Sequence, residues 1–309
     1  MQYLIVCPLV FLAGLVDGML SGSPLAFMIR NTSQHSSDYN NLHDIPRPSH
    51  ADFTARMRYG DKVDMRGGGH FSARLTAPLC VAGGIAIQLL REKGIEIHGH
   101  LKQVGTIQDA PIDMVHPDMK ALGNIATEPI AMLDADKRDE VEKLVMQLKR
   151  DGDSTGGIVE VVATGLPIGL GNPNFDGIEN RLARVIFGIP AIKGISFGCG
   201  FDMCSRLGSE VNDAFTMDGD KITTTTNNSG GIQGGITNGL PLVMQVGIKP
   251  TPSIYKEQHS VSLSKKEDTL LTIKGRHDPC VALRAVPVIE AVTALVILDF
   301  LGDIDHELR

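Results

Sequence analysis

Three segments of the chain combine glycine with cationic or titratable side chains, and they are the places where the sequence is best equipped for chemistry. The first has two parts, Arg47-Pro-Ser-His50-Ala-Asp52 and Arg66-Gly-Gly-Gly-His70-Phe-Ser72-Ala-Arg74. Successive glycines let the backbone approach a ligand closely, and free N–H groups at a helix start attract anions. We expect a helix from about Ser72, so the pattern predicts an anion site; the alternative is a glycine turn with solvated charges. Taken alone, His50 fits a hydrogen-bonded structural histidine better than a catalyst.

The other two segments lie in the second half of the sequence. One is Asn227-Asn-Ser-Gly-Gly231-Ile-Gln-Gly-Gly235-Ile-Thr-Asn-Gly239, followed by Lys249-Pro-Thr-Pro-Ser253. Its paired glycines can wrap a phosphate or a planar ring, with Lys249 as a point charge, although a structural turn explains them equally well. The other is Lys274-Gly-Arg276-His277-Asp278-Pro-Cys280, which puts a cation and a carboxylate on an irregular loop. Such loops often carry function, and the alternative for Arg276 and Asp278 is a surface salt bridge.

Several common catalytic patterns are absent from the sequence. It has no G-x-x-x-x-G-K-[ST], no G-x-G-x-x-G between a strand and a helix, no G-x-S-x-G and no H-E-x-x-H. These absences argue against a P-loop enzyme, a Rossmann dehydrogenase, a serine hydrolase and a zinc protease. Cys199 and Cys204 have no second Cys or His pair nearby, so we expect no metal site.

Composition limits the partners and the compartment. The 309 residues carry a formal net charge of −7 and no Trp, which argues against general binding to nucleic acid or to an anionic membrane. The five cysteines are scattered, as in a protein kept reduced in the cytoplasm. The apolar stretch Tyr3–Val16 is shorter than the roughly 20 residues that span a bilayer, and Pro8 interrupts it. We expect a cytoplasmic protein that binds a small molecule.

Two kinds of segment must position these residues: glycine-dense loops, and apolar runs of helix or strand length. The helical spacing of apolar residues predicts a surface helix over Asp139–Arg150 and a second helix capped by Asp176, with Ile178, Leu182 and Ile186 on one face. Ala73–Leu90 and Val286–Leu301 are apolar nearly all round and predict helices buried on most of their circumference.

Strands are predicted where β-branched and apolar residues run between glycines. The candidates are Ile158–Thr164, Ile192–Phe197 and Leu240–Ile248, with buried strands in the second half of Tyr3–Val16, at Leu20 and at Pro24–Ile29. Asp218–Asn228 reads as a loop or an edge hairpin. Because no linker rich in Pro, Ser or charge divides the chain, one domain of mixed α and β, covering residues 1–309, is favoured over two.

Taken together, the motifs resemble the chorismate synthase family from about Leu12 to Leu301. The resemblance rests on many ordered matches: Ile29-Arg-Asn-Thr, Arg47-Pro-Ser-His50-Ala-Asp52, Tyr59-Gly, Arg66-Gly-Gly-Gly, Ser72-Ala-Arg74, Gly169-Leu-Gly, Phe175-Asp, Lys193-Gly, Asn212-Asp, Gly230-Gly-Ile, Lys249-Pro-Thr and Gly275-Arg-His-Asp-Pro-Cys. It implies an α/β fold, a β-α-β sandwich with helices packed between sheets, and a homotetramer.

The resemblance also implies an activity. The family eliminates phosphate from 5-enolpyruvylshikimate 3-phosphate to give chorismate in the shikimate pathway of aromatic amino-acid biosynthesis. It is a carbon–oxygen lyase that needs reduced FMN without net redox change, so NADPH would serve only indirectly, as reductant.

By the same resemblance, roles can be assigned residue by residue. His50, Asp278 and Arg276 would be catalytic: His50 would protonate the reduced flavin, and Asp278 would receive a proton near the flavin. Arg47, Arg74 and Arg276 would bind the substrate's phosphate and carboxylates. Flavin contacts would come from His70, Phe71, Ser72, Gly234, Lys249, Pro250, Thr251, Pro252, Ser253 and Arg276.

The first residues depart from the family pattern. Members open with a segment containing Glu-Ser-His-Gly, whose histidine is taken to protonate the departing phosphate, and nothing in Met1–Leu20 matches it. We therefore expect a chain that lacks the family's N-terminal segment. The alternative function is a non-catalytic remnant that binds flavin and anions without turnover.

Overall fold

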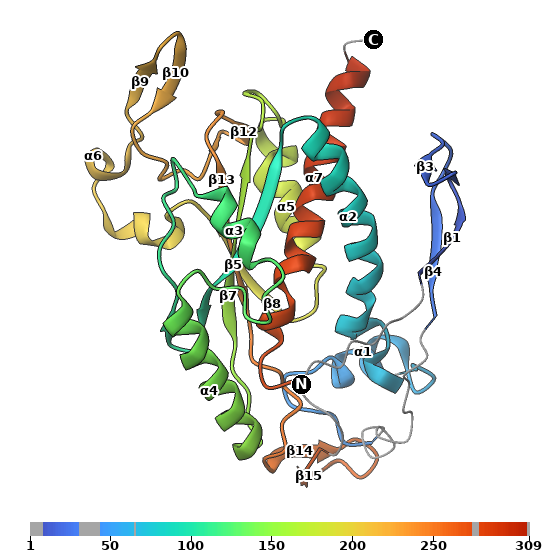
Figure 1. Ribbon diagram of the computed structural model, residues 1–309. Coiled ribbons are helices and arrows are strands. Elements are labelled where there is room, and N and C mark those ends of the chain that lie inside the picture. The colour runs from blue at the N-terminus through green and yellow to red at the C-terminus, as the bar shows by residue number, and fades with distance from the viewer. Residues whose placement is uncertain (1–8, 31–43, 65, 274–277, 308–309) are drawn as a thin grey trace. The chain divides into compact units, whose positions relative to one another are not determined.

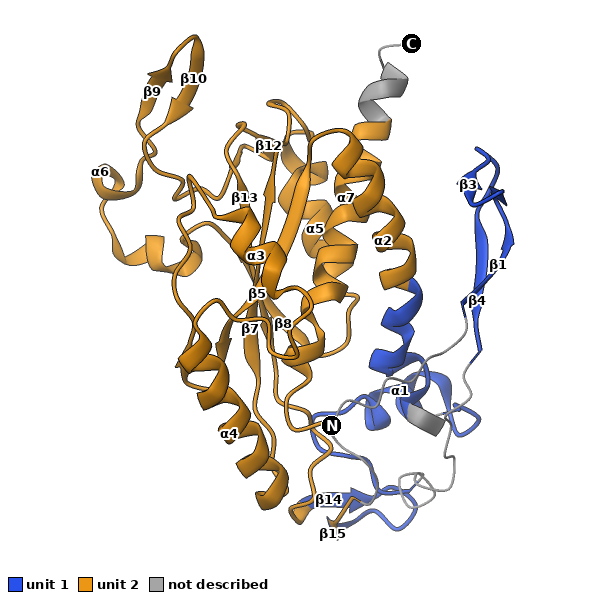
Figure 2. Cartoon of the chain, viewed as in Figure 1, with its two compact units in different colours: residues 1–78, 259–270 blue, residues 79–258, 271–309 orange. Residues whose placement is uncertain are grey.

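The computed structural model describes residues 9–30, 44–64, 66–273 and 278–307. Figure 2 shows the two compact units into which the chain divides: a larger one of residues 79–258 and 271–309, and a smaller one of residues 1–78 and 259–270. The expectation of a single domain over residues 1–309 stays a prediction.

An antiparallel sheet of five strands forms the centre of the larger unit (Figure 1). Its strands are β5 (Glu96–Val104), β6 (Ile107–Gln108), β7 (Gly157–Thr164), β8 (Ile192–Phe197) and β13 (Leu242–Ile248). Their order is β6-β5-β7-β13-β8, and every neighbouring pair runs antiparallel. Val159, Val161 and Val162 of β7 are fully buried, so both faces of this central strand lie in the core.

Four helices of this unit pack against strands of the sheet. They are α3 (Met119–Ile125), α4 (Ala135–Asp151), α5 (Ile178–Ile186) and α7 (Val286–Glu307), while the short helix α6 (Gly208–Val211) has no buried residue. Helix α7 packs against β5, β7 and α5. Two short hairpins complete the unit, β9 (Phe215–Asp218) with β10 (Lys221–Thr224), and β11 (Ile232–Gln233) with β12 (Ile236–Thr237).

The smaller unit consists of hairpins and one short helix. Strand β1 (Leu9–Ala13) pairs with β4 (Ala26–Ile29), β2 (Leu15–Val16) with β3 (Met19–Leu20), and β14 (Gln258–Ser262) with β15 (Glu267–Leu271). Helix α1 spans Asp52–Tyr59, and 3₁₀ turns occupy Arg66–Phe71 and Ala73–Leu75. Helix α2 (Thr76–Glu92) begins in this unit and continues in the larger one.

Most predicted elements of the larger unit are confirmed. Strands β7, β8 and β13 and helices α4, α5 and α7 lie where the patterns placed them, and the tract after Asp218 forms the second half of an exposed hairpin. Ile178, Leu182 and Ile186 are all fully buried, as their common face required. Strand β5 was not predicted, because His98, Gly99 and His100 interrupt its apolar residues.

Helical structure begins at Ser72 as predicted, since Ser72 caps a 3₁₀ turn over Ala73–Leu75 that continues into α2. Three other local predictions were wrong in detail. Only Gly83, Ala86 and Leu90 of α2 are buried within the structure. Asp176 does not cap α5: it pairs with Arg181, while the Asn180 side chain accepts the backbone N–H of Gly177. Strands β1 to β4 form, but β1 is exposed along its whole length, because a two-stranded hairpin has no second layer to bury a face.

Within the part of the chain that the structure describes, one helical stretch, Ala73–Glu92, is long and apolar enough to cross a membrane by length and composition alone. Core helices of soluble proteins pass the same test.

Candidate functional site

The first predicted segment folds into a tight turn that leads directly into α1. The backbone N–H of His50 donates to the carbonyl of Arg47 at 3.2 Å. Pro48 fixes φ at the second position of this turn, and Ser49 adopts a left-handed φ of 58° at the third. Because α1 starts at Asp52, the turn brings three side chains of the Arg47–Asp52 segment together.

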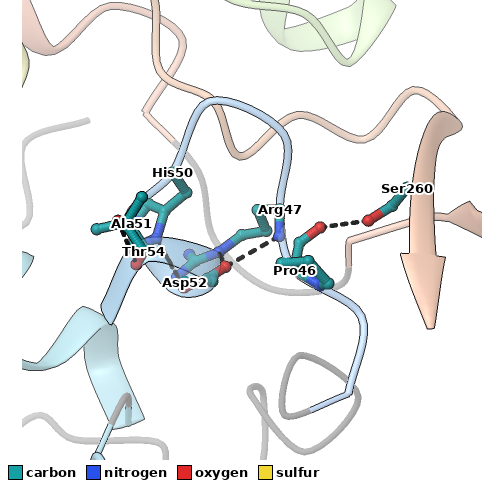
Figure 3. A network of polar contacts seen from close by, with 7 residues as sticks. All are labelled: Pro46, Arg47, His50, Ala51, Asp52, Thr54 and Ser260. Atoms are coloured by element: carbon teal, nitrogen blue, oxygen red, sulfur yellow. Dashed lines mark hydrogen bonds and ion pairs between the residues drawn. The ribbon is translucent and has the colours of Figure 1, made fainter. Parts of the chain in front are cut away.

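Asp52 is the residue that joins this group (Figure 3). Its Oδ2 accepts hydrogen bonds from Arg47 Nε at 2.7 Å and from the Arg47 backbone N–H at 3.0 Å. Its Oδ1 accepts from Arg47 Nη2 at 2.8 Å and lies 2.7 Å from His50 Nδ1. The side chains of Arg47 and Asp52 are each only 6% exposed, and that of His50 is 15% exposed. Arg47 and Asp52 therefore form a buried ion pair with two hydrogen bonds between the guanidinium and the carboxylate.

The charge of Asp52 is set by these neighbours. Burial opposes ionisation, but the hydrogen bonds from Arg47 and His50 outweigh it and hold the pKa of Asp52 well below its usual range. Asp52 is thus a carboxylate throughout the physiological range. Its sequence signal, an acid two residues after a candidate histidine, is visible in the motif, but its role becomes apparent only from the turn.

The loop before the turn is tied to the β14–β15 hairpin of the same unit. Ser260 Oγ donates to the Pro46 carbonyl at 2.5 Å, as Figure 3 shows. Asp44 accepts from Ser262 Oγ at 2.6 Å and from the Ser264 backbone N–H at 2.9 Å. The hairpin thus fixes the start of the Arg47–Asp52 segment.

Among the side chains that the structure describes, the second part of the first segment, from Arg66 to Arg74, has no residue that joins its neighbours as Asp52 does in the first part. Ser72 Oγ accepts the Arg74 backbone N–H at 3.3 Å, and this capping starts the 3₁₀ turn before α2. His70 and Arg74 are exposed, while Phe71 and Ser72 are partly buried. These four predicted ligand contacts lie close in sequence within one short helical stretch.

The paired glycines of the second segment mostly pack against other backbone. A Cβ on Gly230 would lie 2.3 Å from the Gly198 nitrogen, and one on Gly231 would lie 2.5 Å from the Pro241 carbonyl oxygen. A Cβ on Gly235 would lie 2.8 Å from the Asn172 carbonyl oxygen. Gly234 differs, because it has a φ of +63° and nothing within 4 Å of its Cβ position. Of the glycines predicted to admit a ligand here, only Gly234 borders open space.

Lys249–Ser253 and the loop at Asp278 meet at one place, residues 154–156. Ser154 Oγ donates to the Thr251 carbonyl at 2.7 Å, and the Thr155 N–H donates to the Pro279 carbonyl at 2.8 Å. Residues 154–156 therefore contact two segments, Lys249–Ser253 and the loop at Asp278, that were both predicted to lie near the flavin and are far apart in sequence.

The segment Lys249–Ser253 contains buried polar groups, one of which makes no hydrogen bond to the described residues. Ser253 is 7% exposed. Thr251 Oγ1 is buried and has no hydrogen-bond partner among the described residues. Partial burial, together with the charge of nearby Lys193, lowers the pKa of Lys249. Two neighbouring cations and an unsatisfied hydroxyl suit an anionic ligand that carries acceptor oxygens.

Asp278 is held on its loop by a partner that the sequence motif did not indicate. Its Oδ2 lies 3.1 Å from Arg284 Nε, and its Oδ1 accepts the Cys280 backbone N–H at 3.4 Å. Asp278 is 23% exposed and Arg284 is 83% exposed. Arg276, for which all three roles were predicted, lies outside the described residues.

A buried ionic network, also not predicted, crosses the sheet of the larger unit. His100 Nδ1 lies 2.7 Å from Asp109 Oδ2, and His100 Nε2 lies 3.0 Å from Glu160 Oε2. Glu160 also accepts from Lys102 Nζ at 2.6 Å. Although burial opposes a charge on His100, its hydrogen bonds to Asp109 and Glu160 raise its pKa. The only sequence signal is a glutamate among valines in β7.

Comparison with known proteins identifies the family that these motifs resemble. The family model of chorismate synthase matches residues 8–301. A chorismate synthase of Lancefieldella parvula is 41% identical over 302 residues, which cover 94% of this chain and 80% of the relative. Those of Parabacteroides distasonis and Methanosarcina barkeri are 43% and 44% identical, covering 94% and 93% of this chain and 80% and 78% of the relatives.

The fold is also matched by a solved structure. A crystal structure of chorismate synthase superposes with a TM-score of 0.74 at 28% sequence identity, covering 96% of this chain and 78% of the other. The mixed α/β fold class expected from the sequence is confirmed by this likeness.

Proposed function

The chain belongs to the chorismate synthase family, and from this we propose that it eliminates phosphate from 5-enolpyruvylshikimate 3-phosphate to give chorismate, with reduced FMN bound. Chorismate synthases are lyases of aromatic amino-acid biosynthesis. The observation that carries the proposal is the meeting of Lys249–Ser253 and the Asp278 loop at residues 154–156. The comparisons do not favour the alternative of a non-catalytic remnant, because relatives of this one name match most of the chain.

The residues present fit a flavin phosphate and ring. Lys249 and Lys193 supply positive charge, Thr251 Oγ1 has no hydrogen-bond partner among the residues that the structure describes, and Gly234 leaves space where a side chain would intrude. We propose that Lys249 to Ser253 and Gly234 hold the cofactor, with His70, Phe71, Ser72 and Arg276 as further contacts. When bound, reduced FMN would supply one-electron chemistry without net redox change. NADPH would act only upstream, as the source of reducing equivalents.

The chain's own residues would bind the substrate and move protons. A trianionic substrate beside an anionic cofactor needs several cations, and Arg74 offers an exposed guanidinium. Arg47 and Arg276 are the other proposed substrate ligands, and the guanidinium of Arg47 is held by Asp52. His50 would hold and release a proton at a ring nitrogen, and Asp278 would accept one at a carboxylate oxygen. Arg276 would assist both binding and chemistry.

We further propose a cytoplasmic homotetramer that acts on a small molecule. The β9–β10 hairpin supports self-association, because Phe215, Met217 and Ile222 are 72%, 61% and 64% exposed on it. A hairpin with so much apolar surface gains stability when a second copy covers it.

The experiment that tests the function is an anaerobic assay of the purified chain with substrate and chemically reduced FMN. The proposal predicts chorismate and phosphate in equal amounts. FMN binding without phosphate release would instead establish the non-catalytic remnant.

A further inference from the structure

We propose that Asp52 is a positioning residue that fixes the tautomer and the orientation of His50, so that Nε2 is the nitrogen that holds and releases the catalytic proton. The inference rests on the proposed function for its catalytic part. Its structural part rests on the contacts of Arg47, His50 and Asp52 alone.

The tautomer follows from the chemistry of the donors and acceptors. An ionised carboxylate can only accept hydrogen bonds, so the His50 nitrogen 2.7 Å from Asp52 Oδ1 must carry a hydrogen. That nitrogen is Nδ1, and in the neutral ring the proton-accepting nitrogen is therefore Nε2. Arg47 Nη2 also lies 3.0 Å from Nδ1, but both atoms are donors, so Arg47 orients Asp52 and not the imidazole.

The carboxylate of Asp52 is fully engaged by this arrangement. Each oxygen accepts two contacts: Oδ2 from the Arg47 backbone N–H and Nε, and Oδ1 from Arg47 Nη2 and His50 Nδ1. These four contacts fill the lone-pair positions of a carboxylate. Arg47 thus fixes the Asp52 plane, and the Asp52 plane fixes the His50 ring.

The fold explains why the acid stands at this spacing. The turn closed between Arg47 and His50 reverses the chain, and Asp52 follows in the first turn of α1, where a negative charge is favoured.

The first test is the spectrum of the unaltered protein. Imidazole ¹⁵N chemical shifts of His50, assigned with a His50→Gln variant, are followed against pH. The proposal predicts that neutral His50 carries its hydrogen on Nδ1. A hydrogen on Nε2, or an even mixture of tautomers, would overturn it.

The second test compares two variants of α1 and its flank. Asp52→Asn removes the ionised acceptor, whereas Asp61→Asn removes an exposed acid that pairs with Arg56 on the same helix and does not touch His50. We expect Asp52→Asn to lower kcat by between about 10-fold and 10⁴-fold, as when a histidine loses its orienting acid. KM should rise as well, because Asp52 also holds the guanidinium of Arg47. Asp61→Asn should behave as the unaltered protein.

The pH profile separates positioning from a merely structural effect. A neutral amide stabilises the imidazolium less than a carboxylate does, so the alkaline limb of kcat/KM should move to lower pH in Asp52→Asn. Asp52→Glu, which keeps the charge, should restore part of the activity. Unchanged kcat and an unmoved limb in Asp52→Asn would overturn the proposal.

The ¹⁵N spectrum and the activity assay distinguish a wrong positioning role from a wrong function. If the unaltered protein shows the Nδ1–H tautomer but forms no chorismate, the assigned function is wrong and the Asp52–His50 relationship stands. If it forms chorismate while neutral His50 carries its hydrogen on Nε2, the positioning role is wrong and the function stands.

Discussion

His100 Nε2 lies 3.0 Å from Glu160 Oε2, and the same ring reaches Asp109 through Nδ1 at 2.7 Å. The histidine is 1% exposed and bridges β5 and β7 with the loop that follows β6. An imidazole that donates from both nitrogens to carboxylates is protonated. The buried, protonated His100 thus links β5 to β7 and to Asp109 through two ion pairs.

The His100 network should make stability depend on pH. Because the folded pKa of His100 is raised, its contribution is complete below its unfolded value near 6.5 and is lost as pH rises through the folded pKa. The lowered pKa values of Asp109 and Glu160 mean that their contribution is lost as pH falls. We expect His100→Gln to cost about 3 kcal/mol near pH 5.5 and less above pH 8. Calorimetric unfolding across pH measures this, and a pH-independent difference would contradict it.

Glu290 has the same pH sign as His100, but its replacement should stabilise the protein rather than destabilise it. Burial raises its pKa to about 7, although the Gly99 N–H, which donates to Glu290 Oε1 at 2.6 Å, and the charge of Arg91 oppose the shift. The native state therefore binds an extra proton between the unfolded value of 4.5 and about 7, and stability falls as pH rises through this window. Glu290→Gln keeps an acceptor for Gly99 and should stabilise the protein by about 1–3 kcal/mol at pH 8. Denaturant midpoints at pH 8 and pH 4 test this, since the gain should vanish at the lower pH.

Helices α2 and α7 meet at a glycine. A Cβ on Gly83 would lie 2.3 Å from the Cβ of Ala291, whereas one on the neighbouring Gly84 would meet nothing within 4 Å. Gly83→Ala should therefore destabilise by about 1–3 kcal/mol through overpacking. The matched Gly84→Ala should be neutral or stabilise by up to about 1 kcal/mol. Equal effects of the two substitutions on the urea midpoint would show that the helices do not touch at Gly83.

The β9–β10 hairpin provides a test of assembly. If a second copy covers it, Ile222→Glu should shift the protein to smaller species in light scattering after size exclusion, because a charge is costly in an apolar interface. Met146→Glu serves as the control, because Met146 is also an exposed apolar residue, at 49%, but belongs to α4 and not to the hairpin. An unchanged molecular mass in Ile222→Glu would exclude the hairpin from any interface between copies.

The strands and helices that could be predicted from the sequence are those with one strong apolar pattern. Strands β7 and β8 lie between glycines, and α5 presents Ile178 and Leu182 on one face. Strand β5 could not be found this way, because His100 is buried by partners from other elements rather than by apolar neighbours. The burial of α2 was overestimated, because an apolar helix needs a covering layer that its own sequence does not reveal.

The candidate site was predictable as a set of motifs but not as a set of contacts. Arg47 and His50 were singled out by type and spacing, and the structure brings them together. The role of Asp52 depends on a turn with Ser49 at a left-handed φ, and the partner of Asp278 is Arg284, six positions farther along the chain. Neither relationship follows from residue types alone.

The most direct test of the central claim is turnover by the purified chain and by His50→Ala under anaerobic conditions. With 5-enolpyruvylshikimate 3-phosphate and chemically reduced FMN, the unaltered chain should release phosphate and chorismate one to one. His50→Ala should be slower by about 10²-fold to 10⁴-fold, as when a proton-transferring group is lost. Binding of FMN and substrate without phosphate release, or equal rates for the two proteins, would contradict the account.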